Sequence, residues 1–99
     1  MKIIDHTNKS HNNEPISFPA LQCWNPLEKL ITISAQVRGK RILCSISTND
    51  LKKKYHVFVN TPLKTLVEHR SDIECAARKL IKNGSYEQDG TITIRYKDL

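Results

Sequence analysis

The sequence predicts a two-layer α+β domain, in which about four antiparallel strands form one sheet packed on a long helix and a short helix. Three patterns in the 99 residues support this fold class. Segments 30–37 and 41–47 alternate apolar and polar residues, as half-buried strands do. Segment 62–82 repeats its apolar residues at helical spacing. Segment 91–96 alternates again, and with a short strand at 15–18 the predicted order is β-β-β-α-α-β.

The first fourteen residues differ in composition from the rest of the chain. After Ile4 they are almost entirely polar, so ordering them would bury little apolar surface. We therefore expect a flexible N-terminal tail over residues 1–14 and a single α+β domain over residues 15–99.

Residues 30–47 predict a β-hairpin. A two-residue turn at Gly39 and Lys40, with glycine first as in a type II′ turn, sets the predicted register. This register pairs inward residues with inward residues: Val37 with Ile42, Ala35 with Cys44, and Ile33 with Ile46. It also places Arg38 opposite Arg41 on the outward face, where two like charges repel each other.

Two helices are expected after the hairpin. Ser47 to Asp50 resembles a capping sequence that opens a short helix ending near Tyr55. The long helix begins at Pro62, a residue suited to the first helical position, and ends before Gly84. Its predicted apolar stripe consists of Leu63, Leu66, Val67, Ile73, Ala77, Leu80 and Ile81.

Arg70 and Glu74 interrupt that stripe, and they form the first candidate site. Four residues separate the two, so an ion pair within the helix is easy to form. One interpretation is a structural pair that fixes the helix on the sheet. The other is a polar ligand site at the junction of helix and sheet. Trp24 is added to this site as a residue that either caps the core or stacks on a ligand.

A basic strip is the second candidate site. The formal net charge is +6, and most of it falls between residues 38 and 54, where Asp50 is the only acid. The strip consists of Arg38, Lys40, Arg41, Lys52, Lys53 and Lys54. Such a strip would bind nucleic acid weakly and without sequence preference, and an acidic protein surface would serve equally well.

Other kinds of chemistry have no support in the sequence. Cys23, Cys44 and Cys75 have neither disulfide nor zinc-site spacing, and there is no phosphate-binding glycine loop. We expect no catalytic residues, no metal and no cofactor. An apolar stretch long enough to span a membrane is also missing, so we expect a cytoplasmic protein with no membrane contact.

Several landmarks resemble a bacterial family known as domain of unknown function 1488. They are Phe18-Pro19, Trp24, Gly39, Ile42-x-Cys44-x-Ile46, Leu51, Arg70-x-x-Ile73-Glu74, Ala77 and Gly84. The resemblance implies a compact α+β domain of the bacterial cytoplasm without an assigned activity, and it supports the site at Arg70 and Glu74. The long polar tail and the Lys52-Lys53-Lys54 run depart from the family pattern, so the basic strip is not inferred from it.

Two functions follow as hypotheses. The first is a small non-enzymatic binding or regulatory module that contacts an acidic protein or nucleic acid through the basic strip. The alternative is a small enzyme or ligand-binding domain that uses Arg70 and Glu74.

Overall fold

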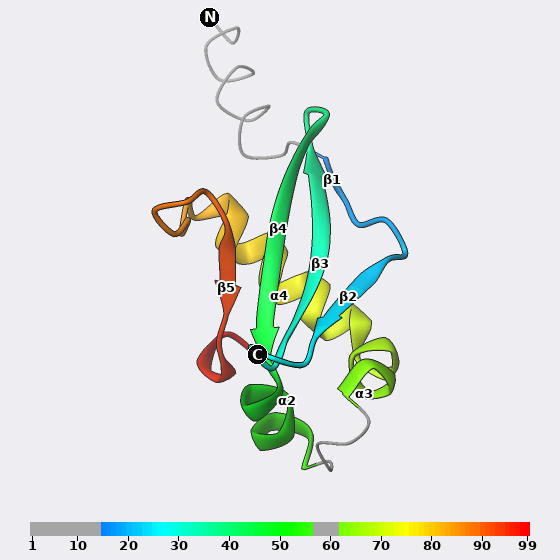
Figure 1. Ribbon diagram of the computed structural model, residues 1–99. Coiled ribbons are helices and arrows are strands. Elements are labelled where there is room, and N and C mark those ends of the chain that lie inside the picture. The colour runs from blue at the N-terminus through cyan, green and yellow to red at the C-terminus, as the bar shows by residue number, and fades with distance from the viewer. Residues whose placement is uncertain (1–14, 57–61) are drawn as a thin grey trace, which may run out of the picture.

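The structure, a computed structural model, describes residues 15–56 and 62–99 (Figure 1). The predicted tail at 1–14 lies outside the described residues. The elements are β1 (Ile16–Ser17), β2 (Gln22–Asn25), β3 (Leu30–Val37), β4 (Lys40–Ser47), α2 (Thr48–Tyr55), α3 (Pro62–Glu68), α4 (Arg70–Lys82), β5 (Ile92–Ile94) and the 3₁₀ helix η1 (Tyr96–Asp98). The predicted α+β class is confirmed.

The sheet is mixed, whereas the sequence predicted an antiparallel one. Its order is β1-β3-β4-β5, and β2 pairs with a second stretch of β3. β5 runs parallel to β4, with Cys44 opposite Ile92 and Ile46 opposite Ile94. The prediction was wrong because the helices between β4 and β5 return the chain to the starting end of β4, as a crossover does. β2 is a strand that the predicted order did not include.

The hairpin has the predicted strands in a different register. Arg38 and Gly39 form the turn, both with positive φ (55° and 75°), as in a type I′ turn. Ala35 therefore pairs with Ile42, Ile33 with Cys44, Ile31 with Ile46, and Val37 with Lys40. Arg41 lies opposite Gln36, so the expected pairing of Arg38 with Arg41 was wrong. Sliding one strand by two residues keeps every side chain on its face, which is why the apolar pattern did not distinguish the registers.

The core lies between one face of the sheet and α4. It is formed by inward residues of β3, β4 and β5 together with residues of the helices: Ile31, Ile33, Ala35, Ile42, Cys44, Ile46, Leu51, Leu66, Ile73, Ala76, Ala77, Ile81, Ile92 and Ile94. Burial raises the pKa of the Cys44 thiol to about 11, so this cysteine acts as a small apolar core residue. The other two cysteines are exposed.

The long helix predicted over 62–82 is broken at His69. This residue has φ −115° and ψ 24°, outside helical geometry, and it separates α3 from α4. α3 takes a different direction from α4 and lies with α2 beyond the end of β4 (Figure 1). Because the helix changes direction, α3 buries Thr65 and Leu66 and leaves Leu63 and Val67 exposed, contrary to the predicted stripe.

The C-terminal strand is shorter than predicted. β5 ends at Ile94, and η1 follows, closed by a hydrogen bond from Arg95 N to Asp98 Oδ2 (2.9 Å). Tyr96, the last residue of the segment predicted as a strand, belongs to η1 and is 44% exposed. No helix in the part of the chain that the structure describes is long and apolar enough to span a lipid bilayer.

Candidate functional site

The six residues of the predicted basic strip lie in two separate groups. Arg38, Lys40 and Arg41 are exposed at the hairpin turn and form what we call the hairpin-tip cluster. Lys52, Lys53 and Lys54 are exposed on α2 and form the α2 cluster. The hairpin-tip cluster lies at the start of β4 and α2 begins directly after the end of β4. The strand has eight residues, a length of roughly 24 Å at the usual rise of a strand. Figure 1 shows them at opposite ends of the hairpin, so a single continuous strip does not exist.

The α2 cluster is partly engaged by the C-terminal segment. The Lys53 ammonium lies 5.0 Å from the centre of the Tyr96 ring, within range of a cation–π interaction. Lys54 Nζ donates to the main-chain oxygen of Leu99 (3.4 Å). α2 itself begins as predicted, because Ser47 Oγ accepts a hydrogen bond from Asp50 N (3.1 Å).

Arg70 connects α4 to the segment between β1 and β2. Its Nε donates to Glu74 Oε2 (2.6 Å), and its Nη2 donates to the carbonyl oxygen of Pro19 (2.6 Å). Nη1 donates to Gln22 Oε1 and, at 3.4 Å, to the carbonyl oxygen of Leu21. The side chains of Arg70 and Glu74 are only 16% and 25% exposed. These contacts occupy the guanidinium with acceptors from the chain itself, which favours the structural interpretation of the pair.

Trp24 lies near this contact but faces the core. It belongs to β2, where it pairs with Ile31, and it is half-buried against the core cluster. Gln22 is two residues away on the same strand and therefore on the same face. The position fits a side chain that covers the core at β2, beside β3.

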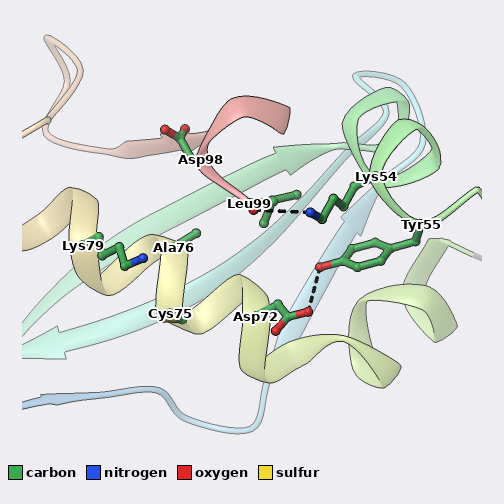
Figure 2. A pocket seen from close by; sticks show the side chains of 8 residues that line it. All are labelled: Lys54, Tyr55, Asp72, Cys75, Ala76, Lys79, Asp98 and Leu99. Atoms are coloured by element: carbon green, nitrogen blue, oxygen red, sulfur yellow. Dashed lines mark hydrogen bonds between the residues drawn. The ribbon is translucent and has the colours of Figure 1, made fainter.

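A surface pocket that the sequence did not reveal lies between α2, α4 and η1 (Figure 2). Its volume is about 280 Å³. Four of its lining residues are charged, namely Lys54, Lys79, Asp72 and Asp98. Tyr55, Cys75, Ala76 and Leu99 complete the wall.

Tyr55 forms the end of the pocket nearest the helix break. Its hydroxyl donates to Asp72 Oδ2 (3.3 Å), as the dashed line in Figure 2 shows. Its ring stacks on the ring of His69, with centroids 3.7 Å apart and planes 11° from parallel. Burial raises the pKa of Tyr55 to about 12, and the negative charge and hydrogen bond of Asp72 act in the same direction. The hydroxyl is therefore a donor at neutral pH.

The pocket residues come from elements that are distant in sequence, so no local spacing identifies them. One sequence signal for the helix break was nevertheless present. Residues 68–72 are five consecutive polar residues in the middle of the predicted helix, which leaves no apolar residue for more than one turn. Within residues 15–56 and 62–99, no group of three His, Cys, Asp or Glu side chains is placed to hold a metal ion.

Comparison with known proteins gives one family and one similar structure. A family model described as "Protein of unknown function (DUF1488)" matches residues 16–94. The crystal structure of a protein of unknown function from this family, from Shewanella loihica PV-4, is 27% identical in sequence. The match covers 84% of this chain and 94% of that chain, with a TM-score of 0.77. A comparison with curated proteins gives no match.

Proposed function

We propose that this chain, which belongs to the DUF1488 family of proteins of unknown function, is a small non-enzymatic binding module that contacts an acidic partner. The contact is made mainly by the hairpin-tip cluster. The partner is a polyanion, either a nucleic acid bound without sequence preference or an acidic protein surface. The module acts in the bacterial cytoplasm, a location supported by the exposed thiols of Cys23 and Cys75, which suit a reducing compartment.

The observation that carries this proposal is the position of the hairpin-tip cluster. Three cationic residues occur within four consecutive positions, on a turn at the end of the hairpin away from α2 and α3 (Figure 1). No ion pair between described residues involves Lys40 or Arg41. Exposed cations of this density attract phosphate or carboxylate groups through long-range electrostatics, and the charges of Lys40 and Arg41 are not paired with any described carboxylate.

The α2 cluster is the weaker candidate for the same contact. Lys53 and Lys54 already interact with Tyr96 and with the main chain of Leu99. Moving them to a partner would break these contacts, so each charge would contribute less to binding. The alternative function at Arg70 and Glu74 is also weaker, since Arg70 donates to Glu74 and to the segment between β1 and β2.

Two triple variants that have the same net charge test the proposal. The tip variant carries Arg38→Asn, Lys40→Gln and Arg41→Gln, with asparagine at position 38 because the residue there has a positive φ. The α2 variant carries Lys52→Gln, Lys53→Gln and Lys54→Gln. Each change removes three positive charges, so both variants fall from +6 to +3 and differ only in where the charge is lost.

Binding is measured by fluorescence anisotropy against a labelled DNA duplex and a labelled poly-glutamate peptide, between about 50 and 200 mM salt. Each neutralised phosphate contributes about 0.9 to the slope of log affinity against log salt, so the tip variant is expected to lose about 2 to 3 from the slope on DNA. The α2 variant is expected to lose about 1 or less. Equal losses in the two variants, or a larger loss in the α2 variant, would refute the role of the tip. Binding to the peptide alone would identify an acidic protein as the partner class.

A further inference from the structure

We propose that the pocket between α2, α4 and η1 binds a small anion carrying a phosphate or carboxylate group, held between the ammonium groups of Lys79 and Lys54. This site is separate from the hairpin-tip cluster. No residue of the tip lines the pocket.

The two lysines supply the positive charge of the pocket, from opposite sides. Lys79 extends from α4 and Lys54 extends from α2, and both side chains point into the space between the elements (Figure 2). Among the described residues, Lys79 Nζ has neither a hydrogen bond nor an ion pair. Lys54 makes a single long contact, to the main-chain oxygen of Leu99, and a lysine ammonium has three donors. Most of the hydrogen-bonding capacity of both groups is therefore available.

The two carboxylates that line the pocket are engaged within the fold. Asp72 accepts the hydroxyl hydrogen of Tyr55 at 3.3 Å, and Asp98 accepts the N–H of Arg95 at 2.9 Å. Each carboxylate thus has a partner within the fold, whereas Lys79 has none among the residues that the structure describes. A hydrogen bond leaves the charge of a carboxylate in place, so the two lysines and the two aspartates of the lining balance formally. Lys79 is the charged lining residue that lacks a partner among the described residues, and its ammonium group suits an anion.

The size of the pocket restricts the ligand to a small molecule. Its volume of about 280 Å³ lies below the lower end of the usual range for drug-sized ligands, which is about 300 Å³. It accommodates an inorganic phosphate or a short dicarboxylate together with some water. Ala76 and Leu99 provide an apolar part of the wall beside the charged groups.

Cys75 serves as a natural reporter of occupancy, and Cys23 is its internal control. Cys75 is exposed and lines the pocket. Cys23 is also exposed, but it lies on β2 between Gln22, which contacts Arg70 of α4, and Trp24, which packs on the core. Because side chains alternate along a strand, Cys23 faces away from α4.

The test compares alkylation of the two cysteines in the intact chain by iodoacetate, an anion, and by iodoacetamide, its neutral analogue. A negative charge about 6 Å from an ammonium in water is favoured roughly threefold. The ratio of the iodoacetate rate to the iodoacetamide rate is therefore expected to be at least about threefold higher at Cys75 than at Cys23. Peptide mass spectrometry measures both sites in the same sample.

Protection by added anions completes the test. Millimolar inorganic phosphate or malonate, at constant ionic strength, is expected to slow alkylation of Cys75 and to leave Cys23 unchanged. The anion that protects Cys75 more strongly identifies the preferred ligand group, phosphate or carboxylate.

Lys79→Gln and, separately, Lys54→Gln should lower both the rate ratio and the protection, whereas Lys82→Gln, on α4 outside the pocket, should change neither. Equal ratios at the two cysteines, or protection by neither anion, would overturn the proposal. The hairpin-tip variant keeps every pocket residue, so a failure of the proposed function at the tip would leave the anion site untouched, and the reverse also holds.

Discussion

Replacing Arg70 by methionine is expected to destabilise the fold by about 3 kcal/mol, because Arg70 joins α4 to the segment between β1 and β2. The change removes the contacts to Pro19 O and Gln22, and hydrogen bonds to a charged group are each worth about 1 kcal/mol or more at partly exposed positions. It also leaves Glu74, which is only 25% exposed, without its cationic partner, for a further loss of about 1 kcal/mol.

Replacing Glu74, the partner of Arg70, is expected to cost less stability than replacing Arg70. Glu74→Leu removes one acceptor, while Arg70 keeps Pro19 O and Gln22, so the expected loss is about 1 kcal/mol. The double variant should lose about 2 kcal/mol, since no unpaired carboxylate remains but the contacts to the β1–β2 segment are still missing. A simple buried ion pair would instead give large and similar losses for both single variants.

Urea unfolding of the two single variants and the double variant measures these differences through the midpoint and the slope. Lys82→Met is the control, because it removes a cation from the exposed end of the same helix. A loss below about 0.5 kcal/mol for Arg70→Met would show that the guanidinium contacts contribute no more than an exposed pair does. A loss for Glu74→Leu equal to that for Arg70→Met would show that the ion pair, rather than the link to the β1–β2 segment, is the important contact.

Two further predictions concern α2. Ser47→Ala removes the side-chain acceptor for Asp50 N and should lower the free energy of unfolding by about 1 kcal/mol in urea melts, whereas Ser47→Asp should largely retain it. Because the folded pKa of Tyr55 is raised to about 12, its contribution to stability is fully present below pH 10, the usual tyrosine value, and is lost as the pH rises toward 12. Tyr55→Phe should remove this part of the alkaline decline, and it should remove the tyrosine absorbance change at 295 nm that occurs at the highest pH. An unchanged titration curve would contradict the raised pKa of Tyr55.

The hairpin shows which part of the fold could be predicted from the sequence and which part could not. Alternation in segments 30–37 and 41–47 correctly predicted two paired strands and their inward faces. It did not predict the register, because registers that differ by two residues bury the same side chains. The observed register pairs all eight residues of β3 with all eight of β4. The predicted one would have placed Ile31 opposite Thr48, which belongs to α2.

The candidate sites were predicted less well than the fold, for a physical reason. Arg70 and Glu74 are neighbours on one helix, so their contact followed from spacing, but the acceptors at Pro19 and Gln22 are about fifty residues away and left no local pattern. The basic strip was inferred from positions in the sequence, and β4 separates its two halves in space. Lys79 and Lys54 approach the same pocket only because α2 and α4 come together through the fold.

The parallel pairing of β5 with β4 has a consequence for the order in which the protein folds. The β3–β4 hairpin joins residues close in sequence and therefore forms at a small cost in loop entropy. Cys44 and Ile92 are separated by almost half the chain, a segment that contains α2, α3 and α4. Their pairing must therefore wait until that segment has been synthesised and has turned back. Ile92 and Ile94 are fully buried and adjoin the central strand. During synthesis this edge of β4 therefore stays unpaired until β5 emerges, and until then it is open to aggregation or to binding by a chaperone.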